Sequence, residues 1–228
     1  MSISNLMSLN FLVPYVASKI DFSRAIRGMR GMPRRLRLVG HKLVGGTLAV
    51  NTLSTITTEA DAITKLGEGS MLLAMWRDAK ANADLGLPID VIAINEGGSA
   101  VKATSALVVG GAPTVGGEVM LYIGGERVSV GVTTADTSAT IATKLSAAIN
   151  AMAKLPVTAA VAASTVTITA RWGGPTGNDI NVRTTYYPDD ALATGVTLTT
   201  PAMAGGAVLP DVTPVITAMN LYRATEIV

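Results

Sequence analysis

The clearest secondary-structure signals of the chain lie in residues Val119–Val161, VMLYIGGERVSVGVTTADTSATIATKLSAAINAMAKLPVTAAV. Two short β-rich runs flank Gly124-Gly125, and paired glycines favour a tight hairpin because both accept positive φ without a Cβ clash. Asp136 or Thr137 can then cap a helix by accepting a free amide of its first turn. Apolar residues follow at helical spacing, namely Ile141, Leu145, Ala148, Ile149 and Met152. Because Pro156 ends that pattern, we predict a hairpin, a helix and a returning strand.

The composition predicts a folded chain with a large aliphatic core. Hydrophobic residues make up 49% of the 228 residues and charged residues 15%, whereas aromatic residues make up only 4%. The core is therefore expected to consist of Val, Ile, Leu, Ala and Met. Cysteine is absent, which excludes disulfides, thiolate catalysis and cysteine metal sites. We expect neither a membrane span nor a secretory signal, because no apolar run is long enough and the N-terminus lacks a basic start.

The charge is divided unevenly along the chain. Residues 1–42 carry eight basic side chains and one acidic side chain, a formal charge of +7, whereas residues 43–228 carry −5. A basic head is typical of nucleic-acid binding, of association with an acidic protein face or of a solvated arm. Gly28 and Gly31 interrupt the arginines, and no aromatic residue lies between Phe22 and Trp76 to stack on bases. These features favour protein association over nucleic acid.

We predict three parts along the chain. Residues 1–32 form an extended N-terminal arm, residues 33–98 and 205–228 form an incomplete α/β layer, and residues 99–204 form an inserted β-rich domain with one helix. In the arm, Phe11–Val16 can form a strand, but Pro14 restricts it to a sheet edge. Such a strand can add to the sheet of a neighbouring subunit. The arm residues expected to make assembly contacts are Phe11, Val13, Tyr15, Arg24, Arg27 and Arg30.

The predicted α/β layer alternates strands and helices, which indicates a parallel sheet. Thr57 or Thr58 caps its first helix, and Pro214 is tolerated in the first turn of its last helix. The chain stops where a further core strand is starting, so we expect either a fragment of a longer protein or a chain completed by its neighbours. The predicted strands are Arg34–Val39, Ile89–Ile94 and Ala224–Val228, and the predicted helices are Glu59–Leu66, Ser70–Ala83 and Asp211–Leu221.

The inserted domain is rich in Thr, Val, Ala and Gly, in short runs separated by turns, which indicates a sandwich or a barrel-like arrangement of strands. Its predicted strands are Ala103–Val109, Val119–Ile123, Arg127–Val132, Val157–Val161, Thr165–Arg171, Ile180–Tyr187 and Val196–Thr199. The predicted fold class is therefore α+β or α/β, with a discontinuous α/β sheet layer, an inserted β-rich domain and an extended arm.

Two segments near the basic head invite a chemical interpretation. Gly40–Thr47, GHKLVGGT, has the spacing of a phosphate-binding loop, but Gly46 stands where that loop needs a lysine. We interpret it as a glycine-rich connection. His41 is the only histidine, so it cannot form a multi-histidine metal site. Lys42 beside it disfavours its protonated form, and we predict a surface histidine.

Other polar residues are better explained by turns than by chemistry. Asp189-Asp190 and Asp179 suggest paired carboxylates or a Ca²⁺ site, but Asp189-Asp190 follows Pro188 and no oxygen-rich loop has metal-ligand spacing. Trp172–Asn178 is a glycine-rich turn between strands, with no adjacent helix start to bind an anion. No Ser/His/acid set has a meaningful spacing. We therefore predict no enzyme and no catalytic, cofactor or metal site.

Six segments, in order, make the chain resemble the N-terminal half of the tail sheath proteins of Mu-like contractile phages, over nearly its whole length. They are SRAIRGMRGMPRRLRLVG (Ser23–Gly40), TTEADAITKLGEGSMLLAM (Thr57–Met75), LYIGGERVSV (Leu121–Val130), AAINAMAKLPVTA (Ala147–Ala159), GPTGNDINVR (Gly174–Arg183) and AMAGGAVLPDV (Ala202–Val212).

The resemblance implies a virion structural subunit that stacks as hexameric rings around a tail tube and contracts to drive the tube through the host envelope. It implies strand exchange between neighbouring subunits, contacts with tube, baseplate and sheath-terminator proteins, and assembly in the bacterial host cytoplasm. It also implies that the β-rich insertion lies outside the sheath. Family members are normally longer, with a C-terminal part that is missing here. No small-molecule substrate, cofactor or membrane is expected.

Two alternatives remain open at this stage. A nucleic-acid-binding module using the Arg-rich N-terminal segment predicts binding that weakens steeply with salt. A phosphate-ligand enzyme on the α/β layer rests only on the degenerate glycine loop and predicts a nucleotide-induced thermal shift.

Overall fold

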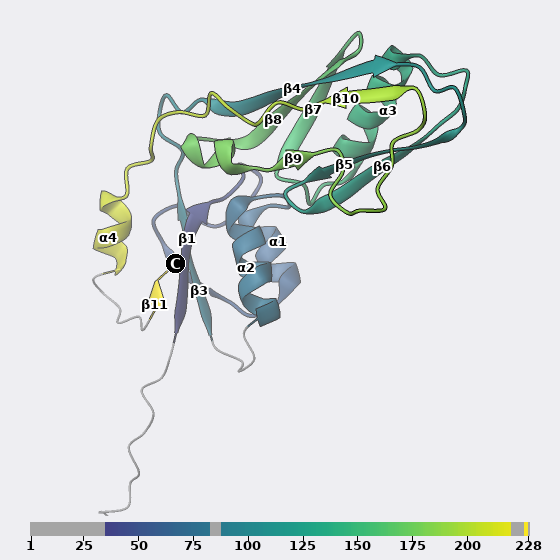
Figure 1. Ribbon diagram of the computed structural model, residues 1–228. Helices are drawn as coiled ribbons and strands as arrows, with labels where there is room; N and C mark the ends of the chain where they lie inside the picture. Colours follow the sequence, from purple (N-terminus) through teal and green to yellow (C-terminus); the bar gives the residue numbers. More distant parts are fainter. Residues whose placement is uncertain (1–34, 83–87, 220–225, 228) are drawn as a thin grey trace, which may run out of the picture. The chain divides into compact units, whose positions relative to one another are not determined.

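The computed structural model describes residues 35–82, 88–219 and 226–227 (Figure 1). The chain divides into two units, residues 1–33 and 34–228, and every described residue belongs to the second. The predicted arm, its edge strand Phe11–Val16 and the six predicted arm contacts lie outside the described residues. The described part is a mixed α/β structure with several sheets and four α-helices.

One four-stranded sheet has the order β11-β1-β3-β2. Its strands are β1 (Leu36–His41), β2 (Leu53–Ile56), β3 (Ile89–Ile94) and β11 (Glu226–Ile227). Strand β1 pairs in parallel with both β3 and β11, as predicted for this part of the chain. Strand β2 is antiparallel to β3 and was not predicted. The connection after β1, residues 42–52, turns the chain round, so β2 runs back against the parallel strands.

Helices cover both faces of this sheet (Figure 1). Helices α1 (Glu59–Leu66) and α2 (Met71–Asn82) bury Leu66, Leu72 and Trp76 against one face. Helix α4 (Thr213–Met219) covers the other face, where its Val215 packs on Ile92 and Ile94 of β3. Thr58 caps α1, as predicted, by accepting a hydrogen bond from the Asp61 amide.

The β-rich part consists of two further sheets, with strand orders β10-β4-β8-β7 and β6-β5-β9. Helix α3 (Ser138–Ala151) buries Leu145 and Ile149 in a core that also contains Leu107 and Leu121. The strands are β4 (Lys102–Gly111), β5 (Gly117–Ile123), β6 (Glu126–Val132), β7 (Val157–Ala162), β8 (Thr165–Gly173), β9 (Val182–Arg183) and β10 (Val196–Thr199).

The segment Val119–Val161 has the predicted form of a hairpin, a helix and a returning strand. Strands β5 and β6 pair as a hairpin across Gly124 and Gly125, whose φ values are 58° and 88°. Thr137 caps α3 by accepting a hydrogen bond from the Thr140 amide. The chain passes Pro156 and returns as β7, antiparallel to β8.

Two predictions for the β-rich part were wrong. The strand predicted over Ile180–Tyr187 is reduced to β9, because the carboxylate of Asp190 accepts hydrogen bonds from the amides of Tyr186 and Tyr187 and folds that segment into a turn. The loop Trp172–Asn178 was predicted to have no adjacent helix start. Most of that loop instead forms a short 3₁₀ helix, Pro175–Asp179, because Gly174 takes a φ of 117° and proline suits the first helical position.

Removing the α3 cap is expected to cost about 1 kcal/mol of unfolding free energy. In Thr137→Ala the amide of Thr140 loses its side-chain acceptor at the exposed start of the helix. Urea unfolding followed by circular dichroism measures the change. The matched control is Thr143→Ala in the same helix, whose hydroxyl bonds only the helix carbonyl of Ala139 and whose loss should change stability by less than about 0.5 kcal/mol. Equal effects of the two variants would contradict the capping role.

Candidate functional site

Of the carboxylates singled out from the sequence, that of Asp190 stabilises a turn. Asp190 accepts hydrogen bonds from two backbone amides and from the Tyr122 hydroxyl. These bonds, led by the Tyr187 amide, lower the pKa of Asp190. Asp179 closes the 3₁₀ helix after β8. Within residues 35–82, 88–219 and 226–227, His, Asp and Glu side chains form no group of three that could hold a metal ion.

The glycine-rich loop after β1 closes the end of α1. Its amides at Leu43, Thr47 and Leu48 donate to the carbonyls of Leu66, Thr64 and Lys65. A Cβ added at Gly46 would lie 2.5 Å from the Lys65 carbonyl oxygen, so only glycine permits this approach. A phosphate loop needs its amides free to bind the phosphate oxygens. Here they satisfy the last carbonyls of a helix, so the structure explains the glycines by packing.

His41 is buried, and the prediction of a surface histidine was wrong. It is the last residue of β1, a strand between β11 and β3, and only 2% of it is exposed. Its Nδ1 atom has no hydrogen-bond partner among the described residues. Burial lowers the pKa of His41, and the charge of Glu96 opposes that shift. Burial, more than the neighbouring Lys42, therefore keeps the imidazole neutral.

The buried histidine predicts a loss of stability in mild acid. The pKa of His41 is lower in the folded chain than its ordinary value of 6.5, so the unfolded chain binds the proton more readily. Neutral His41 contributes its full share to the free energy of unfolding at pH values above the ordinary pKa of 6.5. That contribution is lost as the pH falls through the pKa of His41 in the folded chain. We expect the free energy of unfolding to fall more between pH 7 and 5 in the native chain than in His41→Gln. Parallel urea titrations measure it, and a constant difference between the two proteins would contradict it.

A buried charged cluster crosses three strands of the mixed sheet. Asp90 in β3 and Arg37 in β1 are cross-strand neighbours, each about 1% exposed, with the Arg37 guanidinium 3.8 Å from the carboxylate. Thr55 in β2 donates to the same carboxylate at 2.6 Å, and Arg35 approaches it at 3.4 Å. The sequence does carry a signal for this cluster, because Asp90 is the only charged residue in the apolar run Ile89–Ile94. The cluster joins the three strands at one level of the sheet, where Arg37 and Thr55 are both partners of Asp90.

The mixed sheet ends in two strands that each have one neighbour. Among the residues that the structure describes, β2 pairs only with β3, and the two-residue strand β11 pairs only with β1. An edge strand presents backbone groups on which a further strand can pair. Edges of this kind can accept an extended segment of another chain through backbone hydrogen bonds.

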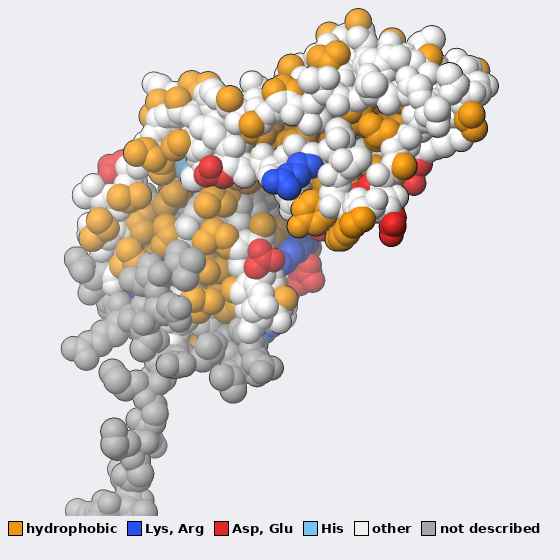
Figure 2. Space-filling model, in the orientation of Figure 1, with side chains coloured by type: hydrophobic (Ala, Val, Ile, Leu, Met, Phe, Trp, Pro, Cys, Tyr) orange, Lys and Arg blue, Asp and Glu red, His pale blue; other side chains and the backbone are white. Residues whose placement is uncertain are grey.

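An exposed apolar segment lies beside the sheet. Leu209 is 73% exposed, and apolar side chains gather over α4 and the strands of the sheet in Figure 2. Val215 of α4 packs inward, whereas Ile216 points to solvent. We call the exposed side chains Val208, Leu209, Val212 and Ile216 the apolar segment. Contiguous exposed apolar surface is typical of protein–protein contact sites.

The described part thus offers sheet edges and an exposed apolar segment. No helix in the described part is long and apolar enough to cross a membrane. No model of a protein family matches the chain.

The chain is 34% identical over 208 residues to the Mu-like prophage FluMu tail sheath protein of Haemophilus influenzae. This similarity confirms the predicted relationship to tail sheath proteins of Mu-like phages. The alignment covers 91% of the chain and 42% of the relative, so the chain spans less than half the length of that protein. A sheath tail protein of Listeria innocua shares 14% identity over 86% of this chain and 40% of that one, with a TM-score of 0.30. That likeness is too low to support a comparison of the folds.

Proposed function

We propose that the chain is a structural subunit of a contractile phage tail sheath. The observation that carries this proposal is the 34% identity to a tail sheath protein over 91% of the chain. In this role the subunits stack as hexameric rings around the tail tube and contract to drive the tube through the host envelope. The neighbours are other sheath subunits, the tube protein, and baseplate and sheath-terminator proteins. The protein then belongs to the virion, after assembly in the host cytoplasm, and acts without catalysis.

The mixed sheet and the arm give this proposal a physical basis. An arm over residues 1–32 that carries a strand can pair with a sheet edge such as β2 of a neighbouring subunit. Its positive charge complements the net −5 of residues 43–228. In this proposal residues 33–98 and 205–228 form the assembling layer and residues 99–204 the outward insertion. Repeated head-to-tail contacts of one chain build an open helical array.

Electron microscopy of the purified product of the complete reading frame tests the proposal. We expect rings or hollow tubes at high protein concentration. A protein that stays strictly monomeric by sedimentation at the same concentration would contradict it.

A charge variant tests the arm itself. Neutralising Arg24, Arg27 and Arg30 together to Gln should weaken self-association by about tenfold or more, because complementary charges steer and orient association. The control neutralises three exposed bases of the β-rich part, Lys102, Arg127 and Lys154, and so makes the same change in net charge. Equal effects of the two variants would assign the loss to net charge rather than to the arm. If only salt-sensitive DNA binding changed, the nucleic-acid alternative would replace the proposal.

A further inference from the structure

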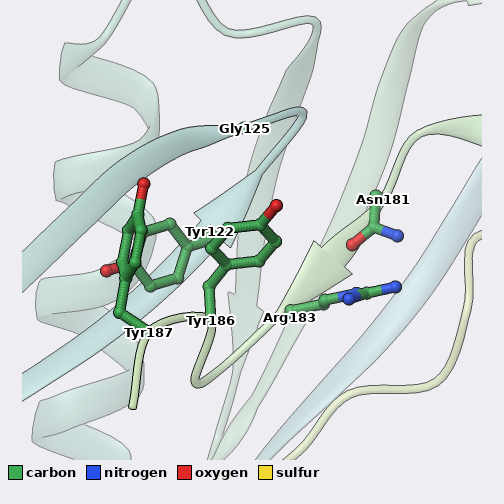
Figure 3. Close-up of a pocket in the computed structure, with 6 residues that line it drawn as sticks. All are labelled: Tyr122, Gly125, Asn181, Arg183, Tyr186 and Tyr187. Atoms are coloured by element: carbon green, nitrogen blue, oxygen red, sulfur yellow. The ribbon is translucent and has the colours of Figure 1, made fainter. Parts of the chain in front are cut away.

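A cavity of about 410 Å³ lies beside the β5–β6 hairpin. Tyr122 comes from β5 and Arg183 from β9, while Tyr186 and Tyr187 lie in the loop that follows. Asn181 and Arg183 are two residues apart, so the period of a strand places them on one face. Figure 3 shows the three tyrosine rings grouped on one side and the Asn181 and Arg183 side chains on the other.

The three rings are held in one arrangement. The ring centroid of Tyr122 lies 5.7 Å from that of Tyr186 and 5.8 Å from that of Tyr187. The ring centroids of Tyr186 and Tyr187 lie 5.0 Å apart, in an edge-to-face contact. Asp190 fixes the group, since it accepts the Tyr122 hydroxyl at 3.0 Å and the amides of Tyr186 and Tyr187 at 2.9 and 2.7 Å. A ligand that meets these rings does not have to order them first.

The rings are also unusually open for this chain. Three of its five tyrosines meet here, although aromatic residues are only 4% of the sequence. Tyr186 and Tyr187 are each 59% exposed, whereas Tyr122 beneath them is buried. Core packing therefore explains the position of Tyr122, but it does not explain why the rings of Tyr186 and Tyr187 are exposed. Fixed, exposed aromatic surface next to polar side chains is typical of a binding site.

The polar groups of the cavity define what it can bind. Arg183 pairs with Tyr122 through the strand ladder, but its side chain makes no ion pair or hydrogen bond with the described residues, so its guanidinium is available to a carboxylate. Asn181 both donates and accepts, and so do the hydroxyls of Tyr186 and Tyr187. A hydroxyl-rich ligand with one carboxylate matches this set of groups, because each hydroxyl also donates and accepts.

Other ligand classes fit the cavity less well. A nucleic acid strand needs several cations along its backbone. The other nearby cation, Arg127, is paired with Glu118 at 3.0 Å, and the Asp190 carboxylate lies within the tyrosine cluster. An extended peptide binds mainly through hydrogen bonds to the backbone of a sheet edge. The polar groups of this cavity belong to side chains, which favours a hydroxyl-rich ligand over an extended peptide.

We propose that this cavity binds a carboxylated sugar. One face of the pyranose packs on one of the two exposed rings, Tyr186 or Tyr187, which stand edge-to-face. The sugar carboxylate pairs with Arg183, and the hydroxyls bond to Asn181 and the tyrosine hydroxyls. The size of the cavity suits one or two sugar units. This site is independent of the proposed sheath function.

Titration of the full chain with methyl β-glucuronide and methyl β-glucoside, followed by saturation-transfer NMR and calorimetry, tests the proposal. We expect the glucuronide to bind about tenfold more tightly, because the pair with Arg183 forms only with the acid. Tyr186→Ala with Tyr187→Ala should weaken binding of both sugars at least about tenfold. Arg183→Gln should remove the preference for the acid and leave glucoside binding unchanged. All three side chains are exposed, and an unchanged thermal midpoint confirms that the variants fold.

Two arms of the experiment separate this ligand from its competitors. A capped glutamate-containing tripeptide and a nucleoside monophosphate are titrated under the same conditions. Tighter binding of either one overturns the proposal, and so does the absence of sugar binding up to millimolar concentration. If both sugars bind equally well and Arg183→Gln changes neither affinity, the proposed pairing of the sugar carboxylate with Arg183 is overturned.

Discussion

Replacing Asp90 with Ala should lower the free energy of unfolding by about 3–5 kcal/mol, since it leaves the buried charge of Arg37 without its carboxylate. Arg37 and Asp90 are each about 1% exposed, so water cannot take over the lost contact. The hydroxyl of Thr55 loses its acceptor at 2.6 Å in the same variant. Urea unfolding followed by far-ultraviolet circular dichroism gives the change in free energy.

Two further variants make the Asp90 result specific. Asp90→Asn keeps an oxygen for Thr55 but removes the charge, so it should fall between the native chain and Asp90→Ala. Asp61→Ala removes a carboxylate that is 38% exposed and pairs with Lys65 on the surface of α1, and it should cost at most about 1 kcal/mol. If Asp90→Ala cost no more than Asp61→Ala, the buried cluster would not stabilise the sheet.

Truncating Leu145 to Ala should cost about 3 kcal/mol of unfolding free energy. Leu145 is fully buried on α3, in the core of the β-rich part that it shares with Leu107 and Leu121. The loss combines the apolar surface that is no longer buried with the cavity left behind. The same urea experiment measures it, with tryptophan fluorescence as a second probe.

The matched control makes the same change where the side chain is in water. Leu209 is 73% exposed, so Leu209→Ala should change stability by less than about 0.5 kcal/mol. A small effect of Leu145→Ala, comparable with that of the control, would show that α3 is not packed as described.

The elements that could be predicted are those whose signals are local. The Gly124-Gly125 pair accepts the positive φ of a hairpin, and Thr58 and Thr137 reach their own helix amides. Each of these signals lies within a few residues of the structure that it specifies. Strand β2 had no comparable signal, because its place in the sheet depends on pairing with β3, 35 residues further along the chain.

The candidate sites could be predicted only in part. Burial of His41 depends on the strands on both sides of β1, and not on Lys42 beside it in sequence. The tyrosine cavity joins Tyr122 to residues more than 60 positions further on. The adjacent tyrosines before Pro188 could have drawn attention to that loop. The six predicted arm residues lie outside the described residues and stay predictions.

The parallel pairing of β1 with β11 has a consequence for the order of folding. Leu36 and Glu226 are partners about 190 residues apart, and closing so long a loop is entropically costly. Pairing of β1 with β3 and the bridge between Val101 and Ala207 shorten the remaining loop to about 30 residues, which lowers the closure cost by about 1.6 kcal/mol. The sheet that contains β1 should therefore acquire its last strand after the β-rich part has folded.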